Sequence, residues 1–271
     1  MPNITKYLAK LKSEYENAII SGGREKVTAL IRSKKIINNI HEYVKAELVS
    51  KGINPRKIYP PNDETKPELT MSGFLKKKSQ DISILSSKPH KEEITEGVLV
   101  GETDIIGKNV TNSSISINVR SQLSSISKNY DTLYERTFAE ALNLHLRVPK
   151  LVMGEVYLIP VFAYDSNAMT ENRIKFSERL PLKYIPAFQK INGRGSIRGD
   201  EYKYERVCLL IVDFNDTQPV VINDINQLVE KDFLTKEQST RYSLYNLTIE
   251  NFVDDILTIY KNRHGSISQL K

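Results

Sequence analysis

The stretch from Ile115 to Glu140, ISINVRSQLSSISKNYDTLYERTFAE, decides the fold of this 271-residue chain. Its β-branched residues alternate with polar ones up to Arg120, which predicts a strand over 114–120. A serine-rich loop with Lys128 follows, and helical spacing then predicts a helix over 130–147. These elements bring acids, cations and hydroxyls together, a combination that is typical of a metal-assisted phosphodiester site.

The composition indicates a globular protein, with 39% hydrophobic and 27% charged residues. The formal net charge of +6 permits a polyanionic partner, although a lysine-rich solvated surface explains it equally well. Cys208, the single cysteine, lies in an apolar run and is expected to be a buried, reduced thiol. No apolar stretch approaches the length of a membrane span, so we expect a cytoplasmic protein without a membrane partner.

Two regions are expected. Residues 4–51 have helical spacing, with a break at Gly22-Gly23 and an end at Gly52, and a proline-rich link follows. This N-terminal helical region, residues 1–67, is expected to clamp DNA or to form a dimer interface. Residues 68–271 are expected to form the catalytic α/β domain.

The sequence pattern of the second region predicts an α/β fold in which helices flank a central mixed β-sheet. Strands are expected at 69–75, 81–86, 97–106, 114–120, 152–163 and 205–214. The runs 151–161 and 207–212 are almost continuously apolar, as in strands that are covered on both faces. Further helices are expected at 181–190 and 249–262, and the glycine-rich segment 189–203 is expected to be a long loop.

Two acids are candidate metal ligands. Asp81 opens a strand of otherwise Ile, Ser and Leu residues; the alternative is a solvent-exposed strand end paired with a neighbouring lysine. Glu135 lies beyond the first turn of the later helix, so it is not explained as a cap; its alternative is a pair with Arg136, Lys128 or another subunit. Asp131 is explained by the helix dipole, and Arg136 and Glu140 are expected to form a structural i, i+4 pair.

The strand over 114–120 places Asn118 and Arg120 on one face. Arg120 could neutralise a phosphate but is too basic to accept a proton, and its alternative is a structural salt bridge. Glu155 interrupts an apolar strand, must be paired if it is buried, and could bind Arg120. Glu102 and Asp104 compete for the role of second carboxylate, although charges at a hairpin edge explain them better.

At these residues the chain resembles the PD-(D/E)xK superfamily of metal-dependent nucleases, and within it type II restriction endonucleases. Asp81 matches the first acid, and Asn118-Val119-Arg120 followed by Ser121-Gln122 occupies the position of the acid-x-Lys motif. The chain departs from this pattern in three places, because Asn118 replaces the acid, Arg120 replaces the lysine and Gln80 stands in place of a proline.

The resemblance implies a restriction-endonuclease-like fold and a homodimer that cleaves double-stranded DNA with Mg²⁺. It implies that Asp81 and Glu135 hold the metal, since some members carry the second acid on the following helix. Arg120 would stabilise the phosphorus, and Lys128 could supply the missing amine unless the metal-bound water needs none. Asn118 and Gln122 are expected as supporting ligands.

DNA contacts are expected at Gln122, at the basic run Lys76, Lys77 and Lys78, and at Arg194 and Arg198 of the glycine-rich loop. Two other functions remain open. One is a repair or junction nuclease of the same superfamily, and the other is a DNA-binding module that has lost catalysis.

Overall fold

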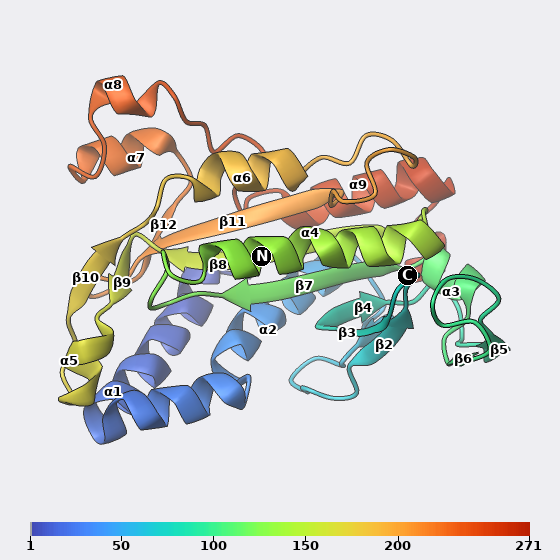
Figure 1. Cartoon of the computed structure of the whole chain (residues 1–271), viewed down its shortest axis with the longest axis horizontal. Helices are drawn as coiled ribbons and strands as arrows, with labels where there is room; N and C mark the ends of the chain where they lie inside the picture. The colour runs from blue at the N-terminus through green and yellow to red at the C-terminus, as the bar shows by residue number, and fades with distance from the viewer. Residues whose placement is uncertain (1) are drawn as a thin grey trace.

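The computed structural model describes residues 2–271, and a six-stranded mixed sheet runs through its centre (Figure 1). Its strands, in spatial order, are β1 (Ile58–Tyr59), β4 (Ile82–Ile84), β7 (Ile115–Ser121), β8 (Val152–Pro160), β11 (Arg206–Asp213) and β12 (Val220–Ile222). The central strands β7, β8 and β11 are parallel, whereas β1, β4 and β12 pair antiparallel with their neighbours.

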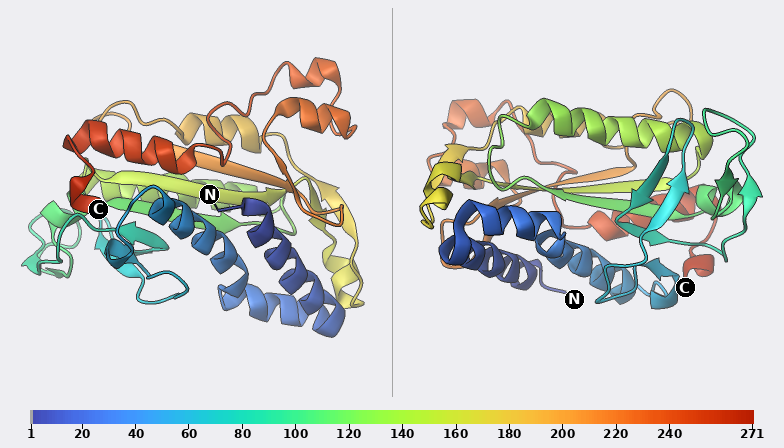
Figure 2. Two further views of the ribbon diagram at one scale, coloured as in Figure 1. Left: turned by 180° about the vertical axis from the view of Figure 1, so that it is seen from behind. Right: turned by 60° about the horizontal axis from the view of Figure 1, so that its bottom comes forward.

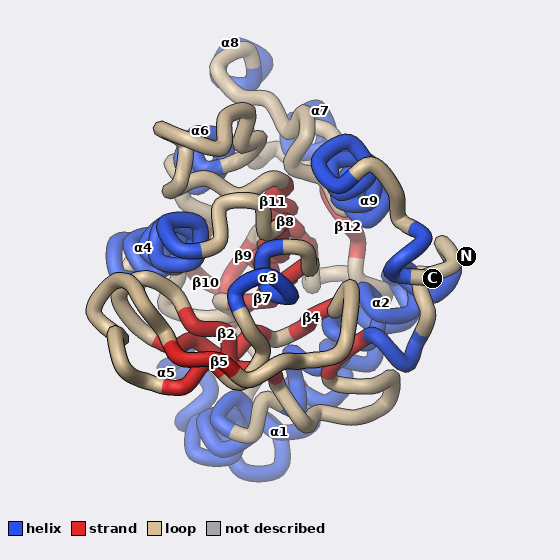
Figure 3. The backbone as a smooth tube through the Cα atoms, turned by 90° about the vertical axis from the view of Figure 1, so that its right-hand side faces the viewer, coloured by secondary structure: helices blue, strands red, loops and turns tan. Residues whose placement is uncertain are grey.

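Helices cover both faces of this sheet, which confirms the expected α/β architecture. One face carries α4 (Tyr130–Arg147) and α6 (Tyr184–Ile191), and the opposite face carries α1 (Ile4–Arg32), α2 (Lys35–Ser50) and α9 (Phe252–His264). Figure 3 shows the two layers from the end of the sheet, and Figure 2 shows the second layer from behind.

No helix within residues 2–271 has the length and apolar character needed to cross a membrane.

The apolar runs became the central strands because both of their faces are covered. Every residue of β8 and β11 is buried, and Cys208 is a buried free thiol as expected. Even-numbered residues of β8 pack toward α1, α2 and α9, and odd-numbered ones pack toward α4 and α6. Because of this alternation, Glu155 points into the layer beneath α4.

The N-terminal helices belong to the same core as the sheet. The predicted break lies inside α1, where Gly22 and Gly23 have non-helical backbone angles and kink the helix. The kink packs on α5 (Ser166–Thr170), and Leu8, Tyr15 and Val44 share one hydrophobic cluster with β7 and β8. β1 precedes residue 67 yet forms an edge of the central sheet, so the change in composition near residue 67 does not coincide with a packing boundary.

Three two-stranded ribbons and several short helices lie outside the central sheet and its covering helices. The ribbons are β2 (Leu69–Ser72) with β3 (Lys77–Gln80), β5 (Glu92–Glu93) with β6 (Thr103–Asp104), and β9 (Phe162–Tyr164) with β10 (Phe176–Arg179). The helices are α3 (Lys108–Asn112), α7 (Ile225–Glu230), α8 (Lys236–Ser239) and two 3₁₀ turns, Pro55–Lys57 and Ser268–Leu270.

The strand expected over 97–106 is wrong for most of its length. Gly97 and Gly101 have positive φ angles of 76° and 85°, which turn the chain, so only β6 remains extended. Asp104 is not an exposed hairpin charge, because it is buried and lies 2.6 Å from Arg147. Glu102 is exposed and pairs with Lys77, so these two acids do not share a face.

The kink in α1 depends on Gly23. Its φ of 56° disfavours any other residue, and a Cβ there would lie 2.5 Å from the carbonyl oxygen of Met169. We predict that Gly23→Ala lowers the free energy of unfolding by about 2–4 kcal/mol, measured by urea denaturation. Gly193 also has a positive φ, 72°, but has open space around it, so Gly193→Ala should cost only about 1–2 kcal/mol. Equal losses would contradict the steric part of this account.

Candidate functional site

The candidate site lies where β4 separates from β7. The ladder between these strands runs from Ile84 opposite Ile115 to Ile82 opposite Ile117, and beyond it β3 pairs with β2 instead. We call this place the strand fork and define it by residues 80–82 and 117–120. Asp81 spans the gap, since its carboxylate accepts the Val119 N–H at 3.0 Å. The side-chain oxygen of Asn118 in turn accepts the Asp81 N–H at 3.3 Å, so side chains here replace the backbone ladder.

A buried amide pair lines the fork on the α4 side. Gln80 accepts hydrogen bonds from the hydroxyl of Ser116 at 2.5 Å and from the amide of Asn118 at 3.1 Å. Both amide groups also donate to one oxygen of Glu140, Asn118 at 3.0 Å and Gln80 at 3.3 Å. The glutamine that stands where the nuclease pattern has a proline is therefore an integral part of the cluster.

Glu140 is the acid that α4 presents to the fork. Its other oxygen lies 2.5 Å from Arg120 and 3.3 Å from the Lys78 ammonium, and its side chain is only 3% exposed. Glu135 is exposed on the same helix, because five residues correspond to about 140° around the helix axis. The expected pair between Arg136 and Glu140 is wrong, since Glu140 faces inward whereas Arg136 faces solvent.

Arg120 contacts two carboxylates that come from different elements, a helix and a strand. Besides Glu140 on α4, it approaches Glu155 of the neighbouring strand β8 at 3.1 Å and donates to the hydroxyl of Thr137 at 2.7 Å. The expected contact between Arg120 and Glu155 is confirmed. Glu155 is 0% exposed and neither of its oxygens makes a hydrogen bond among the described residues.

Glu140 has a second cation, Lys78, beside Arg120, whereas the more buried Glu155 forms an ion pair with Arg120 alone among the described residues. Burial raises the pKa of Glu155 from 4.5 to about 8, although Arg120 acts in the opposite direction. The neighbouring carboxylates raise the pKa of Arg120 despite its own burial, so this side chain stays cationic. The site therefore combines a permanent cation with an acid that holds a proton near neutral pH.

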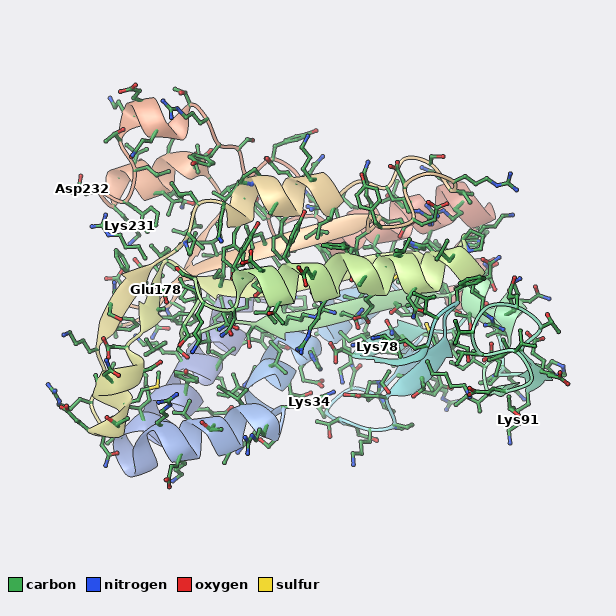
Figure 4. The ribbon with its side chains drawn as sticks, in the orientation of Figure 1. Lys34, Lys78, Lys91, Glu178, Lys231 and Asp232 are labelled. Atoms are coloured by element: carbon green, nitrogen blue, oxygen red, sulfur yellow. The ribbon has the colours of Figure 1, made fainter. Side chains whose placement is uncertain are left out.

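Two lysines form the outer rim of the fork (Figure 4). Alternation along β3 turns Lys78 toward Glu140 and sends Lys77 outward to Glu102. Lys34, at the junction of α1 and α2, forms ion pairs with Glu68 and, at 3.7 Å, with Asp81. The side chains of Lys34 and Lys78 are 52% and 40% exposed, so the rim is open to solvent.

The fork thus brings together Asp81, Asn118, Arg120 and Lys78 of the predicted site residues. It does not bring in Glu135 or Lys128, which are exposed and form no ion pair within residues 2–271. Lys76 is exposed at the tip of the hairpin between β2 and β3, away from the carboxylates. Gln122 donates to the carbonyl groups of Ser124 and Ser125 and shapes the loop after β7.

Arg194 does not lie on an exposed loop, contrary to expectation. It is buried and contacts Glu205 at 3.1 Å as well as the carbonyl oxygens of Pro149 and Ile197. The pKa of Glu205 is lowered to about 2 by His145, Arg263 and a backbone N–H, which outweigh its burial. Arg198 remains exposed, so of the two arginines only Arg198 is free to meet a ligand.

Sequence reasoning missed Glu140, Gln80 and Lys34 as site residues. Glu140 could have been found from the helical spacing, because it falls between Thr137 and Leu144 on the buried stripe of α4. Nothing in the local pattern marks Lys34, since its position depends on how α1 and α2 pack against the sheet.

The side chains at the fork carry the oxygen atoms that a hard divalent cation prefers as ligands. Within residues 2–271 no group of three or more His, Cys, Asp and Glu side chains forms a ready-made metal site. Asn118 nevertheless links Asp81 to Glu140, and Arg120 links Glu140 to Glu155. Mg²⁺ prefers oxygen ligands of this kind, and Asp81 and Glu140, which Asn118 links, are the two acids of the fork that fit it.

The raised pKa of Glu155 predicts a pH dependence of stability. Because its pKa is higher in the folded than in the unfolded protein, the folded state binds more protons between about pH 4.5 and 8. This group should therefore lower the free energy of unfolding as pH rises across that interval, by up to about 1.4 kcal/mol per pH unit. Glu155→Gln should remove this slope in urea denaturation at pH 5, 6, 7 and 8. An unchanged slope would show that Glu155 is ionised throughout.

The identification of this site rests on its geometry. No protein-family model, no curated protein and no solved structure matches the chain. The strand fork unites carboxylates, amides and cations from β3, β7, β8, α4 and the residue between β3 and β4 in a single cluster with an open rim.

Proposed function

We propose that the protein is a metal-dependent endonuclease that hydrolyses phosphodiester bonds in duplex DNA, of the type II restriction class. One observation carries the proposal: Arg120 and Lys78 meet Glu140, beside Asp81, at a partly open fork. Clustered carboxylates with adjacent cations are what phosphodiester hydrolysis requires, since the reaction builds up negative charge at phosphorus.

In this proposal Asp81 and Glu140 hold Mg²⁺, with Asn118 and Gln80 orienting Glu140. The metal, when bound, supplies charge stabilisation and an acidified water. Arg120 neutralises the phosphate and does not accept a proton, because its carboxylate neighbours raise its pKa. Lys78 is the amine nearest to Glu140 and takes the place that Lys128 held in the sequence-based hypothesis.

Duplex DNA as substrate and a homodimer as the active form belong to the same proposal. A two-fold dimer would present one fork to each strand of a palindromic site. A repair or junction nuclease of the same superfamily would use the same residues on a DNA structure rather than a sequence.

A DNA-binding module without catalysis is a second candidate. It is favoured by the pairing of Glu140 and Glu155 with Arg120, because these carboxylates already have a cation as partner. In such a module the fork would contribute to folding and leave only the cationic rim for DNA.

The two candidates predict different results with plasmid DNA. If the protein is a nuclease, supercoiled plasmid with Mg²⁺ should give discrete fragments on a gel, and EDTA should abolish them. Asp81→Asn and Glu140→Gln should each slow cleavage at least about 100-fold, since each removes a proposed ligand and even outer partners of a metal contribute about 10- to 100-fold.

Glu135→Gln is the matched control, because Glu135 lies on the same helix but faces solvent. It should cleave at the wild-type rate. Loss of cleavage in Glu135→Gln with retention in Glu140→Gln would overturn the ligand set proposed for the fork. DNA binding without cutting in the wild type would support the module, and mapped cut ends would separate a sequence-specific from a structure-specific nuclease.

A further inference from the structure

Lys34 occupies an unusual position in the backbone. It is the second of the two residues between α1 and α2, and its φ of 59° and ψ of 3° place it in the left-handed region. That conformation is uncommon for a residue other than glycine, asparagine or aspartate. The turn aims the lysine at the link before β2 and at the fork, where the ammonium meets Glu68 and Asp81.

Lys78 reaches the same fork from a different element of the fold than Lys34 does. It comes from β3, and its carboxylate partner is Glu140, whereas the partner of Lys34 is Asp81. Asn118 is hydrogen-bonded to both Asp81 and Glu140, so the two lysines flank one amide. Figure 4 shows both side chains near the space between the α1–α2 turn and α4, with Lys91 at a distant end of the molecule.

Lys34 is able to exchange partners, because ion pairs between partly exposed side chains contribute only about 0–1 kcal/mol and a phosphate can replace a carboxylate there at little cost. Lys78 keeps its pair with the buried Glu140, but its own side chain is 40% exposed and can meet a phosphate from the solvent side. Arg120 lies deeper, with 19% of its side chain exposed, and adds a third positive charge behind the two lysines. The three cations come from three elements, namely the α1–α2 junction, β3 and β7.

We infer that Lys34 and Lys78 are the two sides of a phosphate-binding track for the backbone of duplex DNA, and that the N-terminal helices form one wall of it. The proposed function enters only in the choice of DNA as the polyanion. A duplex suits the track better than a single strand, because single-strand sites stack bases on exposed aromatic rings. The strongly exposed tyrosines of the described residues, Tyr202 and Tyr245, lie on loops before β11 and α9 instead.

The test is binding of a fluorescently labelled 20-base-pair duplex, followed by anisotropy in EDTA at several salt concentrations. Lys34→Gln and Lys78→Gln should each weaken binding several-fold and reduce the slope of log K against log salt by about 1. Lys34→Arg should restore binding. Lys91→Gln, at an exposed lysine that forms no ion pair within residues 2–271, should match the wild type.

Thermal melting of each variant separates lost contacts from lost folding, and glutamine at position 34 keeps the long stem of the lysine. The inference is overturned if Lys34→Gln and Lys91→Gln bind equally, if the wild type does not bind the duplex, or if a single strand binds more tightly. Because EDTA prevents any metal-dependent cutting, a failure of the proposed nuclease activity would leave this binding result intact.

Discussion

The structure of the site depends on one guanidinium shared between two carboxylates. Arg120 stands on the central strand β7 and contacts Glu140 on the covering helix and Glu155 on the next strand. Removing one partner of a buried charge group leaves the others uncompensated, which is far costlier than losing a surface ion pair. Arg120 therefore fixes the distance between α4 and the sheet at the place where a ligand would enter.

The separation of β4 from β7 makes this arrangement possible. Inside a regular ladder the Val119 N–H would bond to a backbone carbonyl, and no carboxylate could approach it. Because the residues before Asp81 pair within the hairpin of β2 and β3, and the chain joins β7 only from Ile82 onward, the Asp81 side chain takes that bond instead. The same diversion turns Lys78 toward Glu140, so a single irregularity of the sheet delivers both an acid and a cation.

Much of the fold followed from local patterns. The helix over 130–147 was predicted to the residue and the strands β7 and β11 to within one residue at each end, because apolar periodicity was strong there. The strand expected over 152–163 merges β8, which ends at Pro160, with part of β9. Of the small ribbons, β2 lies within the strand expected over 69–75, whereas the strand expected over 97–106 is reduced to β6 by glycines and by the hydrogen bonds of Asp104, which override propensity. Asn118 and Arg120 were found because they stand on β7, and Asp81 because it directly precedes β4, whereas the choice between Glu135 and Glu140 depends on which face of α4 meets the sheet. The contribution of Lys34 depends on contacts more than 30 residues apart in the chain, which no local pattern records.

The two-residue strand β1 has a practical consequence. Ile58 and Tyr59 pair with Ile84 and Ser83 along the edge of the central sheet, and the Leu85 N–H donates to Lys57 just before them. A fragment that starts at residue 68 would expose the backbone of β4 together with the apolar surface that α1 and α2 cover. Open strand edges of this kind recruit other chains, so such a fragment should self-associate rather than behave as an autonomous unit.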